Sequence, residues 1–253
     1  MTGEPEQETE RPVGSRLPET ALDWSQLADD TVFIIGAGHF GSRAARIIRG
    51  RSEAPVFVVD PEEQALSAVK DIRVEAISAD GIEFLVAHLP EMKAANTIVP
   101  ALPLHLAYEW LIRFLPANMN IQKLTVPETT PPLPHAAPAS EGSTLVSYAD
   151  FRCPDDCPEP VYCTVTGEKR EKPLFALLRD QAIPPFQIHI VRSHQLAPGL
   201  GGYKVDDLKE IAEEVLKRKK RMWILGTACK CHGILTAFKL NDLTQRTQGH
   251  REY

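Results

Sequence analysis

Three glycines near the start of the chain limit most strongly what it can fold into. The segment VFIIGAGHFGSRAARII places Gly36, Gly38 and Gly41 in the spacing G-x-G-x-x-G, directly after a β-branched apolar run and directly before a stretch with helical spacing of apolar residues. In such a strand–turn–helix unit the first glycine permits a tight turn, the second lets the backbone approach a pyrophosphate, and the third lets the helix pack on the strand. Phosphates would meet the unsatisfied N–H groups of the helix N-terminus. We therefore predict a dinucleotide site at this loop, with His39 and Phe40 inside it.

An acidic residue at the end of the next apolar segment indicates which dinucleotide would bind. Asp60 closes the predicted strand 55–60 and follows Gly41 by 19 positions. A carboxylate at this place accepts hydrogen bonds from the adenosine ribose hydroxyls and repels a 2′-phosphate, which favours NAD over NADP. The alternative is a glycine-rich turn that has lost its ligand. Within the loop, His39 is expected either to touch the pyrophosphate or to face solvent.

Short apolar segments alternate with helical patterns through the first half of the chain. The strand patterns fall over residues 32–35, 55–60, 73–78, 96–102 and 120–126, and the helical patterns over residues 39–50, 62–70, 80–89 and 104–115. Strands that alternate with helices predict a parallel sheet covered on both faces. The fold class that we expect is α/β, a Rossmann-like parallel sheet with a smaller cysteine-containing α/β C-terminal portion, which could pack on the same sheet.

The composition along the chain predicts four segments. Residues 1–22 are acidic and nearly without apolar side chains, which predicts a disordered tail. An NAD-binding Rossmann domain is expected over 23–126, and a proline-rich linker or covering loop over 127–142. The remaining segment, 143–253, contains strand patterns, an amphipathic helix over 205–221 and every cysteine of the chain.

The charge balance makes two classes of partner improbable. The 253 residues include 28 Lys and Arg against 34 Asp and Glu, a formal charge of −6, which gives no general attraction to nucleic acid or to anionic lipid. The basic run over 217–221 ends a helix that begins with acidic residues, as the helix dipole favours. No apolar run reaches the roughly 20 residues of a membrane helix, and the N-terminus lacks a signal peptide pattern. We therefore expect a cytoplasmic protein with no nucleic acid partner and no membrane insertion.

The five cysteines form two groups, FRCPDDCPEPVYC and GTACKCHG. In a reducing compartment such residues are more often ligands, redox groups or buried small side chains than disulfides. Three interpretations stay open: a metal site with zinc or an iron–sulfur cluster, a reactive thiol or transient disulfide pair, and inert packing. For a metal site, the expected ligands are Cys153, Cys157 and Cys163, with Cys229 or Cys231 completing four.

Part of the chain resembles the TrkA-N domains of potassium-uptake and potassium-channel regulators, also called regulator-of-potassium-conductance domains. The segments VFIIGAGHFGSRAARII, VFVVDPEEQAL and ISADGIEFL carry the resemblance, which covers about residues 31–100. It implies an NAD-binding Rossmann domain that is commonly a homodimer. It also implies that Asp80 lies near the adenine, although Ala79 stands where the family usually has glycine.

Together these patterns favour a redox function. The leading hypothesis is a cytosolic NAD-linked oxidoreductase with a thiolate metal site in the second half, and the alternative is a non-enzymatic regulator that senses nucleotide or redox state. A dehydrogenase acting on a tetrapyrrole or another small anion ranks third. His105 is a second-rank candidate for proton transfer, because it follows the fourth strand pattern at an edge where ligands bind.

Overall fold

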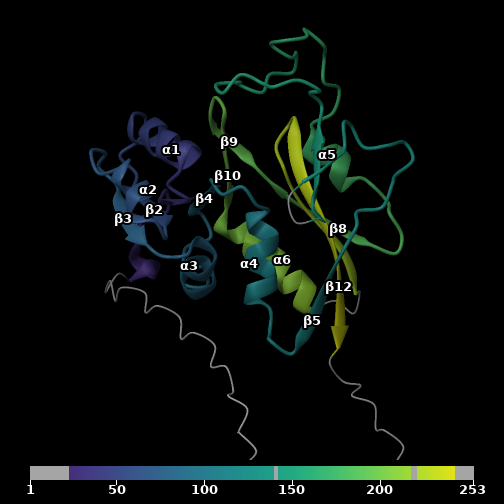
Figure 1. Cartoon of the computed structure of the whole chain (residues 1–253), viewed down its shortest axis with the longest axis horizontal. Coiled ribbons are helices and arrows are strands. Elements are labelled where there is room, and N and C mark those ends of the chain that lie inside the picture. Colours follow the sequence, from purple (N-terminus) through teal and green to yellow (C-terminus); the bar gives the residue numbers. More distant parts are fainter. Residues whose placement is uncertain (1–22, 140–141, 218–220, 243–253) are drawn as a thin grey trace, which may run out of the picture.

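Two six-stranded sheets form the computed structural model, which describes residues 23–139, 142–217 and 221–242 (Figure 1). The predicted acidic tail over 1–22 lies outside these residues, as does the middle of the basic run. None of the helices in the described part of the chain is long and apolar enough to cross a membrane.

The first sheet has the strand order β3-β2-β1-β4-β10-β9. Its strands are β1 (Val32–Ile35), β2 (Val56–Asp60), β3 (Glu75–Ser78), β4 (Thr97–Pro100), β9 (His194–Ala197) and β10 (Leu200–Lys204). The first four are parallel, and β1 aligns Val32 with Val56 on one side and with Thr97 on the other. Every residue of β1 and β2 is buried, because helices cover both faces of the sheet. The Rossmann-like α/β prediction is confirmed.

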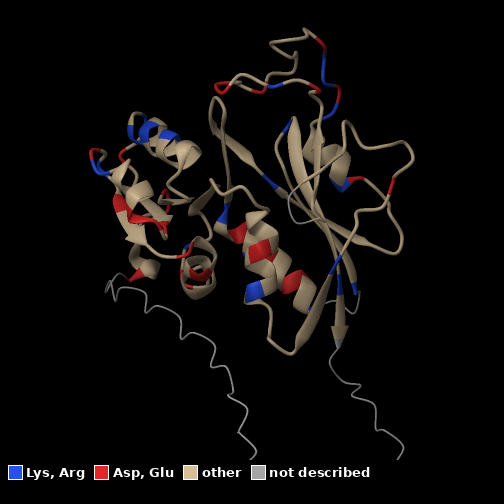
Figure 2. Ribbon diagram, viewed as in Figure 1, with Lys and Arg blue, Asp and Glu red and all other residues tan. Residues whose placement is uncertain are grey.

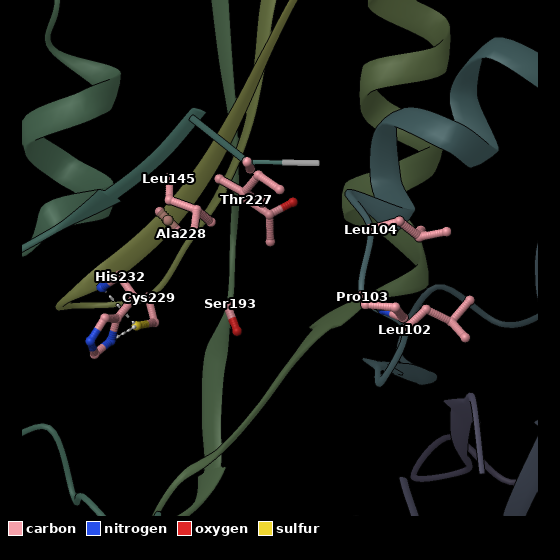
Figure 3. Close-up of a pocket in the computed structure, with 12 residues that line it drawn as sticks. Leu102, Pro103, Leu104, Leu145, Ser193, Thr227, Ala228, Cys229 and His232 are labelled. Carbon is pink, nitrogen blue, oxygen red and sulfur yellow. Dashed lines mark hydrogen bonds between the residues drawn. The ribbon is translucent and has the colours of Figure 1, made fainter. Parts of the chain in front are cut away.

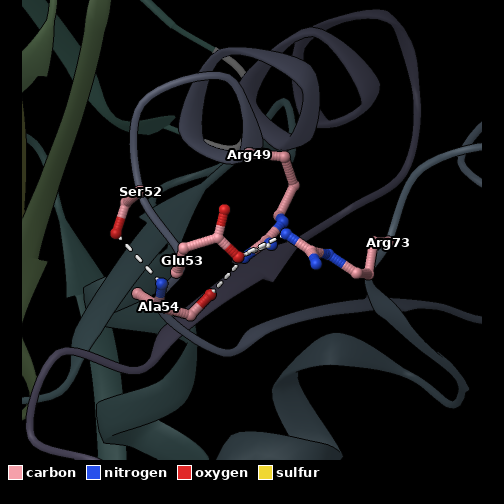
Figure 4. A network of polar contacts seen from close by, with 5 residues as sticks. All are labelled: Arg49, Ser52, Glu53, Ala54 and Arg73. Atoms are coloured by element: carbon pink, nitrogen blue, oxygen red, sulfur yellow. Dashed lines mark hydrogen bonds and ion pairs between the residues drawn. The ribbon is translucent and has the colours of Figure 1, made fainter.

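A helix follows each of the four parallel strands, as the sequence predicts. These helices are α1 (His39–Arg49), α2 (Glu63–Ser67), α3 (Gly81–His88) and α4 (Leu106–Phe114). Several basic residues lie on α1, as Figure 2 shows. At the end of α1, Arg49 donates to the Ala54 carbonyl at 2.6 Å and pairs with Glu53, which also contacts Arg73 (Figure 4). These contacts fix the turn that leads into β2.

The second sheet is built around the long strand β12. Its members are β5 (Met119–Leu124), β6 (Ala137–Pro138), β7 (Thr144–Ser147), β8 (Gln187–Arg192), β11 (Met222–Ala228) and β12 (His232–Asp242). The strand predicted over 120–126 forms as β5, but the expectation that it extends the parallel sheet is wrong. β5 pairs antiparallel with β12, and its alternately exposed and half-buried residues suit a sheet with one solvated face.

The two sheets share one hydrophobic core. The chain leaves the second sheet at the end of β8 and enters the first at the start of β9, so both sheets contain strands from the second half. Between the sheets lie α4 and α6 (Val205–Lys217), while α5 (Leu174–Arg179) packs on the second sheet (Figure 1). Buried side chains of both sheets, such as Phe33 and Phe238, belong to the same cluster. The proposed division at residue 126 thus crosses continuous packing.

Candidate dinucleotide and metal site

The glycine loop between β1 and α1 has the backbone that its sequence predicts. Gly36 has a φ of +105°, and a Cβ there would lie 2.8 Å from the Ala101 carbonyl oxygen. A Cβ on Gly41 would lie 1.8 Å from the Gly36 carbonyl oxygen, whereas a Cβ on Gly38 would meet nothing within 4 Å. The first and third glycines are therefore required by packing, and the second leaves open space over the helix N-terminus.

Asp60 holds this loop in place from the end of β2. Its Oδ2 accepts a hydrogen bond from Ala37 N at 2.7 Å, and its Oδ1 accepts one from Glu62 N at 2.8 Å. The residue is only 8% exposed. Each carboxylate oxygen has more than one lone pair, so both oxygens can accept a further hydrogen bond from a ligand hydroxyl.

The other residues predicted for the dinucleotide site occupy different positions. Asp80 is the N-cap of α3, and its Oδ1 accepts hydrogen bonds from Ile82 N and Glu83 N, both at 2.9 Å. His39 and Phe40 are exposed in the first turn of α1, and their rings are in edge contact. Phe40 is 66% exposed, unusual for a large apolar side chain.

A cavity of about 290 Å³, here called the cysteine cavity, lies beside Phe40. Phe40 and Arg43 of α1 line it on one side, and it also contacts residues of both cysteine groups and of the β9–β10 hairpin. These further lining residues are Cys153, Pro154, Asp155, Cys157, Glu159, Ser193, Gln195, Gly199, Leu200, Gly201, Cys229 and His232. The two sites predicted separately from the sequence therefore meet at one cavity.

Three side chains around this cavity can converge on one cation. One ligand atom each from Glu159, Cys229 and His232 lies within 4.8 Å of the other two. His232 also lies between two thiols, with Nε2 at 3.5 Å from Cys153 Sγ and Nδ1 at 3.9 Å from Cys229 Sγ. Thiolate, imidazole and carboxylate are the ligand types that zinc takes.

Burial disfavours charge on the Cys229 and His232 side chains. Burial and the neighbouring Glu159 raise the pKa of Cys229 to about 12, and desolvation lowers the pKa of His232. The imidazole is thus neutral, as a ligand must be, and a bound cation would favour the thiolate form of Cys229 over the thiol.

Two cysteines sit in turns that direct backbone N–H groups at sulfur. Cys229 Sγ accepts from Cys231 N at 3.4 Å and from His232 N at 3.3 Å. Cys163 has the same arrangement: N–H groups of Thr166 and Val165 hydrogen-bond it and lower its pKa. Donors two and three residues further along the chain stabilise a thiolate in both turns.

The remaining cysteines lie close to this group. Cys231 is buried and accepts a hydrogen bond from Arg170 Nη1 at 2.5 Å, while burial raises its pKa to about 11. Charge on Cys153 or Cys157 would raise that pKa further. The structure thus brings the five cysteines into one region, and the choice of four among them as ligands stays a prediction.

Sequence reasoning missed two contributors to the site. Glu159 lies between Cys157 and Cys163 with a φ of 49°, and its place inside a cysteine loop was the only local signal. Arg43 belongs to α1, far from the cysteines in sequence. His232 follows Cys231 directly in the second cysteine group, and its position between two thiols makes it a ligand candidate.

Arg43 connects the dinucleotide helix to the cysteine loop. Its Nη2 donates to the Asp155 carbonyl at 2.8 Å and its Nη1 to the Gly199 carbonyl at 3.4 Å. Gly199 N donates in turn to the Cys157 carbonyl at 2.9 Å, and a Cβ on Gly199 would lie 1.6 Å from the Asp155 oxygen. The loop carrying Cys153 and Cys157 is therefore docked on α1 and on the β9–β10 turn.

Replacing Arg43 by methionine should loosen the cysteine loop. Two charge-assisted hydrogen bonds are lost, so amide hydrogen exchange over 153–157 should rise about tenfold. Hydrogen–deuterium exchange followed by mass spectrometry measures this. Arg46→Met is the matched control, because Arg46 lies on the same helix but pairs with exposed Asp71. Equal exchange in the two variants would contradict the docking role.

A second cavity of about 510 Å³, here called the apolar cavity, lies between the two sheets (Figure 3). Cys229 and His232 are on the side of the second sheet, and Leu102 and Leu104 follow β4 on the side of the first. Its other lining residues are Pro103, Ala139, Leu145, Ser193, Thr227, Ala228, Gly233 and Ile234. Both cavities contact Ser193, Cys229 and His232.

His105 lies behind the apolar cavity as a buried neutral base. Its Nδ1 lies 2.8 Å from Thr236 Oγ1 and its Nε2 lies 3.0 Å from Thr227 Oγ1. Burial, with a smaller effect of the Lys123 charge, lowers its pKa to about 3. The Tyr108 ring stacks on the imidazole, and Lys123 in turn lies over that ring.

The buried imidazole predicts a loss of stability in mild acid. The unfolded chain takes up a proton at His105 near its ordinary pKa of 6.5, whereas the folded chain does not until pH approaches about 3. The free energy of unfolding therefore decreases, and the protein becomes less stable, by about 2 kcal/mol from about pH 7 to about pH 5. Urea unfolding of the wild type and of His105→Gln at both pH values measures the difference. An equal acid dependence in the two proteins would show that His105 is not the cause.

Two family models match consecutive parts of the chain. The family model for the TrkA-N domain matches residues 32–106, and a model described as "Uncharacterized protein, C-terminal domain" matches residues 107–241. An uncharacterized protein of Archaeoglobus fulgidus is 33% identical over 216 residues, which are 81% of this chain and 98% of that protein. No solved structure matches the chain. The predicted TrkA-N resemblance is confirmed, and the two matches meet at α4.

Proposed function

The chain belongs to the family defined by this uncharacterized C-terminal domain, here preceded by a TrkA-N domain, and from that premise we propose that it is an NAD(H)-dependent oxidoreductase with a bound zinc ion. TrkA-N domains bind NAD(H) in general and are nucleotide-binding regulatory or redox-related domains. The observation that carries the proposal is the cysteine cavity, which borders α1 of the glycine loop and the cysteine groups together.

The dinucleotide part of the proposal rests on the glycine loop. Gly38 leaves open space over the N-terminus of α1, and Asp60 lies beside it with acceptor capacity for ribose hydroxyls. Ligands of open α/β sheets bind outside the carboxyl ends of the strands. The segment after β4, which includes Leu102, borders the apolar cavity at that edge. When bound, NAD(H) would supply a hydride donor or acceptor at this edge.

The metal part rests on the mixed ligand set. Glu159, Cys229 and His232 would supply three protein ligands beside the cysteine cavity, and Cys153 is within reach of His232. A zinc site with three protein ligands keeps one position open for substrate or water, and this is the arrangement of catalytic zinc. Iron–sulfur clusters rely mainly on cysteine, so the presence of Glu159 and His232 favours zinc over a cluster.

Anaerobic purification of the full-length chain tests both parts. We expect about one zinc ion per chain by elemental analysis, no visible absorption band, and saturable binding of NADH with weaker binding of NADPH. Broad visible absorption with bound iron would replace zinc by a cluster. A protein that binds neither metal nor NADH would rule out the proposed function.

The alternative regulatory function has one observation in its favour. Arg43 links the helix of the glycine loop to the cysteine loop, so the occupancy of one site can change the order of the other. A sensor of this type would show no turnover, and NADH would change its association state instead. The TrkA-N resemblance implies a homodimer, so sedimentation with and without NADH distinguishes the two functions.

A further inference from the structure

We propose that the apolar cavity binds an uncharged carbonyl or hydroxyl compound whose oxygen hydrogen-bonds Thr227, the exposed end of the buried chain Ser143–Thr236–His105–Thr227. The inference rests on the proposed function, because this cavity would then be the substrate site beside the zinc ion. It adds the chemical class of the ligand and the residue that recognises it.

The hydrogen-bond chain is continuous, and its members come from both parts of the molecule. Ser143 Oγ and Thr236 Oγ1 are 2.8 Å apart, and His105 bridges Thr236 and Thr227 with its two ring nitrogens at 2.8 and 3.0 Å. Ser143, Thr236 and His105 are buried, at 4%, 0% and 4% exposure. Thr227, two residues before Cys229 on β11, is the member that lines the cavity.

The number of donor hydrogens in this hydrogen-bond chain shows why Thr227 can hydrogen-bond a ligand. A neutral imidazole has one N–H, so His105 donates to one of its two threonine partners and accepts from the other. In one direction His105 donates to Thr227, whose own hydrogen is then free to donate into the cavity. In the other direction Thr227 donates to His105 and offers an oxygen lone pair to the cavity. The same residue therefore recognises a carbonyl oxygen or a hydroxyl group.

Thr227 retains this free capacity in the structure. Within the described residues its Oγ1 has His105 as its hydrogen-bond partner and no second one. The two ends of the hydrogen-bond network differ in surroundings, because Ser143 is buried whereas Thr227 is half-buried and lines the cavity. Here the chain ends at a cavity, where the next partner would come from a ligand.

The remaining lining residues define the rest of the ligand. Leu102, Leu104, Leu145 and Ile234 give the cavity an apolar wall. Among the described residues that line it, none is Lys, Arg, Asp or Glu. Apart from the proposed zinc ion, nothing in this lining could pair with a charged group, so an uncharged compound with an apolar body fits the wall best.

The test uses the full chain and a pair of probes with the same ring, cyclohexanone and cyclohexanecarboxylate. Ligand-observed NMR titration should show saturable binding of cyclohexanone and at least about tenfold weaker binding of the carboxylate. Thr227→Val keeps the shape but removes the hydroxyl, so cyclohexanone affinity should fall about five- to tenfold. Thr227→Ser keeps the hydroxyl and should stay within about twofold of the wild type.

Zinc content, NADH affinity and thermal melting are measured on the same samples. If zinc and NADH bind but Thr227→Val binds cyclohexanone like the wild type, the recognition role is wrong while the proposed function stands. Preferred binding of the carboxylate, or no binding of cyclohexanone to the wild type, overturns the ligand class. If neither zinc nor NADH binds yet the valine and serine variants differ as expected, the proposed function fails and the ligand site remains.

Discussion

Replacement of Asp60 by alanine is expected to weaken NADH binding about a hundredfold in the full-length protein. The carboxylate holds the glycine loop through Ala37 N and the following turn through Glu62 N, and its remaining lone pairs can accept hydrogen bonds from ribose hydroxyls. Removing it leaves the buried Ala37 N–H and the half-buried Glu62 N–H without this partner and removes the acceptor for the ligand. Fluorescence titration with NADH measures the loss.

The direction of cofactor preference separates the two roles of Asp60. If the carboxylate contacts the ribose, Asp60→Ala also removes repulsion of a 2′-phosphate, so the preference for NADH over NADPH must shrink. If it only supports the loop, both affinities fall equally. Asp71→Ala is the control for charge, because Asp71 is exposed and pairs with Arg46. Unchanged NADH affinity in Asp60→Ala would place the dinucleotide elsewhere.

The parallel core of the first sheet could be predicted because its signals are local. β1 and β2 are continuous apolar runs buried along their whole length, and Gly36 and Gly41 are glycines because a Cβ would collide with backbone. The Gly41 constraint acts on Gly36, five residues away, and the strand, the glycines and the helix follow one another directly, so their pattern is visible without a structure.

The partners of the later strands could not be predicted in the same way. The segment over 197–203 looks like a glycine loop, yet it forms the turn and second strand of a hairpin that completes the first sheet. Gly202 lies in that strand because a Cβ there would come within 2.8 Å of the Ile98 carbonyl oxygen. Glycine in a strand can mark a close approach of another backbone, and the identity of that backbone is a long-range property.

The contacts of the candidate site are also long-range and could not be predicted from local patterns. The cysteines stand out by type, and the family resemblance marks the glycine loop, but neither pattern says that the two face one cavity. Arg43 and Asp155, whose contact joins the two regions, are 112 residues apart. The place of Glu159 between two cysteines does not show that it lies beside Cys229 and His232, because that contact joins residues about 70 positions apart.

The metal site gives the largest expected effect of a single substitution. Cys229→Ser and His232→Ala should each lower the zinc content from about one ion per chain to below about a tenth, because losing one of so few protein ligands weakens binding strongly. Elemental analysis after dialysis against a mild chelator measures the content. Melting temperature should fall with it, since a bound ion stabilises only the folded chain.

Cys231→Ser is the matched control that decides between ligand sets. Cys231 lies two residues from Cys229 on the same turn, but its sulfur accepts from Arg170, whereas Cys229 approaches both Glu159 and His232. If Glu159, Cys229 and His232 hold the ion, Cys231→Ser keeps its zinc. If Cys231→Ser loses the metal and Cys229→Ser retains it, the ligands are the cysteines of the first group together with Cys231, and the open position beside the apolar cavity disappears. Because that open position connects the metal to the proposed substrate site, this pair of variants tests the catalytic assignment as well as the ligands.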